Sequence, residues 1–133
     1  MSTIRIAGAP ISWGVCEVPG WGHQMGPDRV LTEMSALGLE AMEFGPLGFL
    51  PEDAEGRKAT LAKHNMSAVG GFFPVVLHDP GFDPLPSIAT ELDAYVAADA
   101  EVLVLAAETG LEGYDAPRPE MAEENWQTVA DNL

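Results

Sequence analysis

Several side chains that can take part in catalysis follow the ends of short apolar runs. Ser12 and Trp13 come after the first run, Glu43 lies at the end of the second, His78 follows the third and Glu108 follows the fourth. In proteins with parallel strands, active sites form at the carboxyl ends of those strands. Carboxylates and imidazoles at such a place can carry protons. The pattern therefore predicts one active-site rim, with Glu43 and Glu108 as its catalytic residues.

The carboxylates and the tryptophan also have structural explanations. Glu43 lies between Met42 and Phe44, where an apolar strand should continue, and Glu108 follows an all-apolar run. A buried carboxylate that is paired with a partner would explain either position without catalysis. Trp13 can stack on the apolar face of a bound ring, or it can plug the mouth of the fold. Both explanations are open for all three residues.

The other candidates at the rim are aromatic or ionisable. Phe72 and Phe73 point to opposite sides of one strand, so one can line a pocket while the other packs under a helix. His78 is a candidate for substrate binding, and an ordinary loop position is its alternative. Cys16 has no histidine or aspartate spaced to activate it as a nucleophile. The predicted substrate-binding residues are Ser12, Trp13, Phe72 and His78.

Four apolar runs must position these residues. They cover residues 4–9, 39–44, 67–73 and 102–107, and each is expected to form a strand. The third is expected to stop at Pro74. The fourth is wholly apolar, which is typical of a parallel strand that is covered on both faces.

Amphipathic stretches separate the runs and are expected to form helices. The first should begin at Pro27 and end before Gly38, because proline suits the first helical position and glycine the position after the last turn. A weaker helix is expected at residues 51–64, and a third should begin with Ser87 as its N-cap. The last helix is expected along residues 121–133.

The alternation of strands and helices predicts an α/β fold with a parallel sheet and right-handed crossovers. One unit takes about 32 residues, so eight units would need ~260, close to the length of a (β/α)8 barrel. Residues 1–133 are expected to be the N-terminal half of a single TIM barrel domain, or about its first four β/α units. The ending at Leu133, within a predicted helix, suggests truncation. An open four-stranded sheet is the alternative, although no G-x-G-x-x-G or P-loop motif follows a strand.

Composition excludes several classes of partner. The chain has 21 acidic and six basic residues, a formal net charge of −15, and 47% hydrophobic residues. A surface with this much negative charge repels nucleic acid and anionic lipid. Neither is therefore an expected partner. The single cysteine forms no intrachain disulfide, and neither a signal peptide nor an apolar run of ~20 residues is present. The sequence therefore predicts a cytoplasmic protein.

Three segments are similar to a known family. Residues 6–14 (IAGAPISWG), 42–51 (MEFGPLGFLP) and 69–73 (VGGFF) resemble the inosose dehydratase branch of the xylose-isomerase-like sugar phosphate isomerase/epimerase barrels. The resemblance extends over essentially the whole chain, as the first four β/α units. It implies a TIM barrel whose substrate rim includes Trp13, Glu43 and Glu108.

The resemblance also implies a metal and a reaction. A divalent manganese, cobalt or magnesium ion would be held by ligands on later strands, beyond Leu133, and this chain alone offers too few ligands for a hard cation. The implied activity is a lyase that dehydrates a ketocyclitol such as 2-keto-myo-inositol through an enediolate. A sugar isomerase or epimerase of the same barrel family is the nearest alternative, because both begin with removal of a proton beside a carbonyl.

Two readings of other classes have different consequences. An endonuclease-like relative is disfavoured because six basic residues are too few for a phosphate backbone. A non-catalytic half-barrel would expose the edges of its first and fourth strands and an apolar face, and it should therefore form a homo-oligomer or aggregate.

Overall fold

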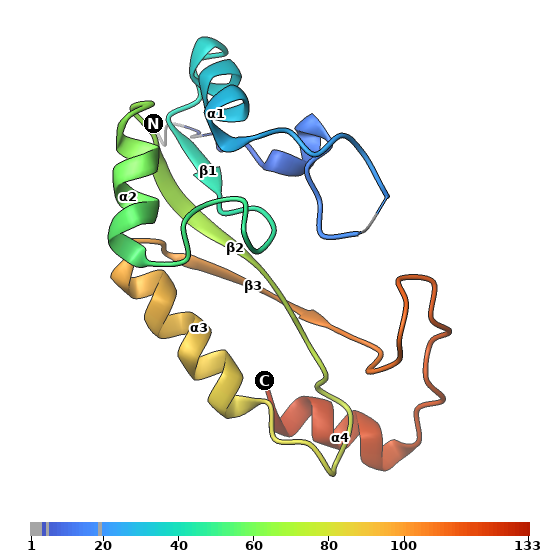
Figure 1. Ribbon diagram of the computed structural model, residues 1–133. Coiled ribbons are helices and arrows are strands. Elements are labelled where there is room, and N and C mark those ends of the chain that lie inside the picture. The colour runs from blue at the N-terminus through green and yellow to red at the C-terminus, as the bar shows by residue number, and fades with distance from the viewer. Residues whose placement is uncertain (1–3, 5, 19) are drawn as a thin grey trace.

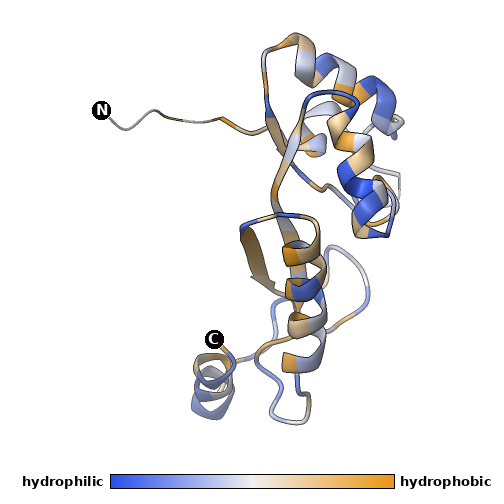
Figure 2. Ribbon diagram, turned by 90° about the vertical axis from the view of Figure 1, so that its left-hand side faces the viewer, coloured by the Kyte–Doolittle hydropathy of each residue, from blue (hydrophilic) through white to orange (hydrophobic). Residues whose placement is uncertain are grey.

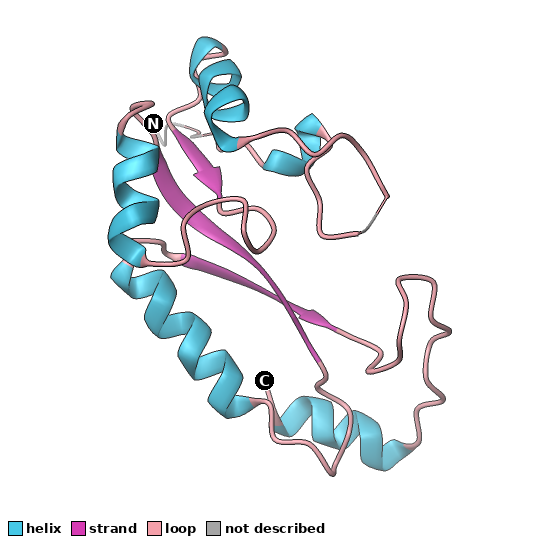
Figure 3. Cartoon of the chain, viewed as in Figure 1, coloured by secondary structure: helices cyan, strands magenta, loops and turns pink. Residues whose placement is uncertain are grey.

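A computed structural model describes residues 4, 6–18 and 20–133, which form a parallel sheet of three strands with helices between them (Figures 1 and 3). The sheet order is β1-β2-β3. In chain order the elements are η1 (Pro10–Trp13), α1 (Pro27–Ala36), β1 (Ala41–Glu43), α2 (Ala54–Ala62), β2 (Ser67–Val75), α3 (Leu85–Ala97), β3 (Val102–Ala107) and α4 (Glu123–Asp131). The mixed α/β class and the parallel pairing are thus confirmed.

The ends of the first two helices follow from local sequence. α1 begins with Pro27, and Gly38 after it has a left-handed φ of 81°. α2 begins after Asp53, whose side chain accepts a hydrogen bond from the Gly56 amide at 2.7 Å. Asn65 ends the helical segment with a φ of 56°, a conformation that asparagine tolerates better than most residues.

The described residues of the first apolar run, 4 and 6–9, do not form a strand, contrary to the prediction. Gly8 makes an isolated parallel bridge to Met42, with its amide donating to Ala41 at 2.9 Å and its carbonyl accepting from Glu43 at 2.9 Å. The chain then turns at once into η1, because Pro10 has no amide to continue the ladder. Ile4 and Ile6 on the same run are 88% and 71% exposed, and positions 1–3, 5 and 19 lie outside the described residues.

The prediction that the third run stops at Pro74 is also wrong, because β2 passes through Pro74 and ends at Val75. In a parallel strand, alternate residues bond to one neighbouring strand or the other. The carbonyls of Val69 and Val75 accept from residues at the two ends of β3, whereas the Gly70 carbonyl accepts from Phe44 beyond β1. Pro74 therefore lies at a position that faces β1. β1 ends at Glu43, which pairs with Gly70, so β1 has no residue opposite Pro74. The missing amide of Pro74 therefore costs no ladder bond, and β2 continues to Val75.

Ser87 is not the N-cap of α3. The helix begins two residues earlier, at Leu85, whose amide donates to the side chain of Asp83 at 3.1 Å. Ser87 instead donates its hydroxyl to the Pro84 carbonyl at 2.8 Å, within the first turn. Pro84 and Pro86 are compatible with this early start, because the backbone amides of the first helical turn have no acceptor within the helix.

The core lies on one face of the sheet. Val30, Leu31 and Met34 of α1 pack with Met42 of β1 and Leu61 of α2, and all are at most 2% exposed. The same cluster includes Tyr95 and Ala98 of α3. Figure 1 shows α2 and α3 along one side of the strands. Open doubly wound sheets carry helices on both faces, whereas this one-sided layer is consistent with a segment of a barrel.

The opposite face of the sheet is open. Phe72, Val102 and Val104 are 51%, 46% and 43% exposed, and the strands carry hydrophobic colouring beside α3 in Figure 2. The expectation that the fourth run is covered on both faces is therefore wrong for this chain. Its Leu103 packs on the core, whereas the valines on either side do not.

This open face leads to a first prediction. The isolated 133-residue chain should self-associate at micromolar concentration, because pairing two such faces removes apolar surface from water. Sedimentation velocity over a range of concentrations would measure the association. The double substitution Phe72→Ser with Val104→Thr should raise the concentration needed for association by about tenfold. A wild-type chain that stays monomeric would contradict the prediction.

Within the part of the chain that the structure describes, no helix has the length and apolar character that crossing a lipid bilayer would require.

Candidate functional site

Two cavities of similar size lie at opposite ends of the strands. One, of about 520 Å³, is lined by Leu39, Glu40 and Asn65 and so lies where β1 and β2 begin. The other, of about 510 Å³, lies between the loop after β2 and the loop after β3. In parallel β/α proteins chemistry takes place at the carboxyl ends of the strands. The second cavity is therefore the candidate functional site, and it is called the rim pocket below.

Polar side chains from three segments line the rim pocket. His78 and Asp79 come from the loop after β2, Thr109 comes directly after Glu108 at the end of β3, and Glu120 precedes α4. Phe82, which is 45% exposed, adds an apolar wall. A histidine, two carboxylates and a hydroxyl beside an aromatic ring suit a ligand that has several hydroxyl groups and an apolar face.

Sequence reasoning found only part of this pocket. His78 was predicted, and Glu108 adjoins the lining through Thr109, with its amide donating to the Val75 carbonyl at 3.0 Å. Asp79 and Thr109 were missed, although each directly follows a predicted residue. Glu120 and Asn125 were also missed, and no spacing in the sequence singles them out, because a long loop after β3 brings them back to the sheet.

Ser12, Trp13 and Glu43 form a separate group at the end of β1. The ring of Pro10 packs so closely against Gly45 that a β carbon there would lie 2.7 Å from Pro10 Cγ. This contact sets η1 beside the end of β1. Ser12 is exposed in η1, while Trp13 and Glu43 are half-buried.

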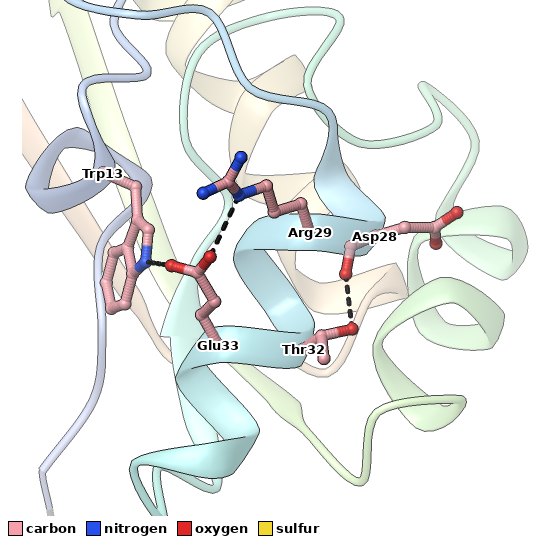
Figure 4. A network of polar contacts seen from close by, with 5 residues as sticks. All are labelled: Trp13, Asp28, Arg29, Thr32 and Glu33. Carbon is pink, nitrogen blue, oxygen red and sulfur yellow. Dashed lines mark hydrogen bonds and ion pairs between the residues drawn. The ribbon is translucent and has the colours of Figure 1, made fainter.

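The indole of Trp13 is held by α1 (Figure 4). Its Nε1 donates to Glu33 Oε2 at 2.8 Å, and Arg29 Nε donates to Glu33 Oε1 at 3.0 Å. The Arg29 guanidinium, together with the Trp13 indole, holds the pKa of the Glu33 carboxyl below its ordinary value of 4.5. The indole thus has a fixed orientation, and its polar edge is directed at α1.

A second prediction follows from this network. Because the pKa of Glu33 is lowered in the folded protein, its contribution to stability is present above pH 4.5 and is lost as the pH falls below that value. Tryptophan fluorescence of the wild type should therefore change in acid at a pH below 4.5. The Glu33→Gln variant, which keeps an acceptor for the indole but does not titrate, should lack this change. Identical acid titrations in both proteins would contradict the assignment.

The structure does not bring the two predicted catalytic carboxylates together. Glu43 is in register with Gly70, and Gly70 is in register with Val102, so Glu108 lies six residues further along β3. At about 3.3 Å per residue this is roughly 20 Å along the strand. Figure 1 shows β3 continuing well past the end of β1. In the described chain the predicted rim is therefore two groups, one with Glu43 and one with Glu108.

Phe72 lies between the two groups. It is 51% exposed on the open face of β2, while Phe73 is half-buried on the side of the helices, as Gly71 shows by its contact with Tyr95. The prediction that the two rings point to opposite sides is confirmed. Phe72 is the one that is free to contact a ligand on the open face.

Tyr95 of α3 packs against Phe44, the residue that follows Glu43. Its ring meets that of Phe44 edge-on, with the centroids 5.1 Å apart, and the side chain is 3% exposed. Burial, with a further contribution from the Glu91 carboxylate, raises the pKa of Tyr95 to about 12. The phenol therefore stays protonated near neutral pH and cannot serve as a general base there.

Among the described residues, no group of three or more His, Cys, Asp or Glu side chains comes together to hold a metal ion. The resemblance assigns the ligands of its divalent metal to later strands, so the described residues do not test that expectation.

Comparisons with known proteins show one informative similarity. The chain is 34% identical over 79 residues to the inosose dehydratase of Geobacillus kaustophilus (strain HTA426). The match covers 59% of this chain and about a quarter, 25%, of that relative's length. No family model matches the chain, and no solved structure matches it. This partial similarity supports a distant relationship to the inosose dehydratase family and suggests a family of sugar-modifying enzymes.

Proposed function

We propose that this chain belongs to a lyase that removes water from a ketocyclitol similar to 2-keto-myo-inositol, and that the rim pocket binds the ring. The observation that carries the proposal is the 34% identity to an inosose dehydratase, together with a pocket at the carboxyl ends of β2 and β3 that has both polar and apolar side chains in its lining. The pocket volume of about 510 Å³ is in the range of small-molecule sites. The complete site is expected to lie in a barrel to which this chain contributes the first units.

The residues of the rim pocket have distinct roles in this proposal. The His78 imidazole and the Thr109 hydroxyl hydrogen-bond the ring hydroxyls, and Phe82 contacts the apolar face of the ring. Glu108 adjoins the pocket through Thr109. Its carboxylate takes the proton from the carbon beside the ketone, which leaves an enediolate. The protonated Glu108 carboxyl then returns the proton to the hydroxyl on the next carbon, which departs as water while a carbon–carbon double bond forms. The divalent metal expected from the resemblance would stabilise the enediolate charge in the intact enzyme.

The charge of the pocket supports an uncharged substrate over a sugar phosphate. Among the described residues that line it, none is lysine or arginine, whereas Asp79 and Glu120 are acidic. Phosphate groups are bound mainly by arginine, lysine and helix N-termini. A sugar-phosphate isomerase is therefore less well supported than a lyase that acts on a neutral polyol.

Mass spectrometry of the reaction products tests the proposal. The intact protein, as its host produces it, would be incubated with 2-keto-myo-inositol and with manganese. A product lighter by one water is expected. A compound of unchanged mass that liquid chromatography separates from the substrate would support the isomerase or epimerase instead, and the absence of any product would support a non-catalytic role.

A further inference from the structure

We infer that Asn125 and Asn132 of the α4 segment are positioning residues for His78, because their side-chain amides hold the loop that carries its imidazole. The inference rests on the proposed function only in that it takes His78 to be a substrate-binding residue. The name amide clamp is used below for Asn125 and Asn132 together.

Both residues bond to consecutive carbonyls of the same loop. Asn125 Nδ2 donates to the His78 carbonyl at 3.1 Å, and Asn132 Nδ2 donates to the Leu77 carbonyl at 2.9 Å. The two asparagines are seven residues apart, which is about two helical turns, so they lie on one side of α4. The loop carbonyls follow the last ladder pair of β2, Val75 with Ala107. The amide clamp thus supplies donors where the sheet no longer does.

The clamp accounts for the way α4 is attached. None of the residues of α4 is buried, and Trp126 is 52% exposed, so apolar packing contributes little to its position. Figures 1 and 2 both show α4 apart from α1 and α2, beside the loop that follows β2. Leu77, in contrast, is only 3% exposed, so one end of the clamp is attached to a rigid point.

Asn125 has a second role that a test must preserve. Its Oδ1 accepts from the Ala122 amide at 2.9 Å and so caps the start of α4, while its Nδ2 reaches the loop. Asn125 also lines the rim pocket beside His78. A change at this position that keeps the acceptor and removes the donor would release the loop without uncapping the helix.

The expected effect concerns His78 and substrate affinity more than the chemical step. If the loop loses one donor, the arrangement that holds His78 is destabilised by the free energy of about one hydrogen bond. This corresponds to about a three- to tenfold change in the equilibrium between the held and the released loop. KM for the ketocyclitol should rise by about this factor, while kcat should change less. The nuclear magnetic resonance signals of the His78 ring should shift in the ligand-free protein.

The test uses Asn125→Asp and Asn132→Asp in the intact protein. Aspartate keeps the Oδ1 acceptor and loses the amide donor, so α4 stays capped. Gln127→Glu is the matched control, because it makes the same amide-to-acid change on α4 at an exposed residue whose side-chain amide donates to Asp131 of the same helix. Asn132→Ala is a second variant without the added charge, and circular dichroism would verify that every variant is folded.

The outcomes separate this inference from the proposed function. Shifted His78 signals in both aspartate variants, with Gln127→Glu unchanged, would support the clamp even if the wild type did not act on a ketocyclitol. Unchanged His78 signals in Asn125→Asp and Asn132→Ala would overturn the inference, whatever the activity. A change in kcat as great as that in KM would overturn the assignment of a positioning role.

Discussion

Replacing Gly70 with alanine should prevent the chain from forming its native sheet or lower its free energy of unfolding by more than about 3 kcal/mol, because the new methyl group would overlap the backbone of β3. A β carbon at position 70 would lie far inside van der Waals distance of the Val102 carbonyl oxygen. This oxygen belongs to the backbone and cannot rotate away as a side chain could. Gly70 also pairs with Glu43 at the register irregularity between β1 and β2. A shift of Gly70 away from β3 would therefore disturb its pairing with β1.

Gly26→Ala provides the matched control for this result. A β carbon at position 26 meets nothing within 4 Å, and its φ of −68° suits alanine. Loss of the preferred N-cap glycine should cost at most about 1 kcal/mol. Urea denaturation followed by circular dichroism would give both values. If Gly70→Ala were as stable as Gly26→Ala, the close approach of β2 to β3 would be contradicted.

The substitution Glu108→Gln should lower turnover of the ketocyclitol by the intact enzyme at least tenfold, which is about 1.4 kcal/mol of activation free energy. Glutamine is nearly the same shape as glutamate but cannot take up a proton at neutral pH. Substrate affinity should change less than turnover, because the ring is bound by His78 and Thr109 in the proposed site. Steady-state kinetics of the purified variant would separate the two parameters.

Glu43→Gln gives the informative comparison. The sequence pattern predicts a loss of at least tenfold at Glu43 as well, since both residues end apolar runs. The register of the sheet predicts a smaller one, because roughly 20 Å along the strands is too far for both carboxylates to reach one six-membered ring. We expect Glu43→Gln to retain more activity than Glu108→Gln. Equal losses would mean that both serve one site, and wild-type kinetics in both would remove the catalytic assignment.

Hydrophobic pattern and end signals were sufficient to predict most of the elements. Val102–Ala107 forms a strand with the predicted bounds, and Pro27 and Gly38 mark the ends of the first helix region as expected. These signals are local, since they depend on the conformations that proline and glycine allow. Errors occurred where the outcome depends on a neighbouring strand. Pro74 continues β2 only because no partner lies on its amide side.

The candidate site could be predicted less well, for a physical reason. The rule that residues after strands gather at one end gave His78 and Glu108, but it gives no information on how far each strand extends. β1 has three residues and β2 has nine, so their ends lie at different heights. The rule therefore placed Glu43 with Glu108. Glu120 and Asn125 reach the pocket through tertiary folding of a long loop, which no local pattern records.

The most direct test is a crystal structure of the intact Glu108→Gln enzyme with 2-keto-myo-inositol bound. The predicted result is a ring in the rim pocket, with its hydroxyls bonded to His78 and Thr109 and the carbon beside its ketone next to residue 108. A ring bound instead at the end of β1, against Trp13 and Glu43, would contradict this placement of the active site.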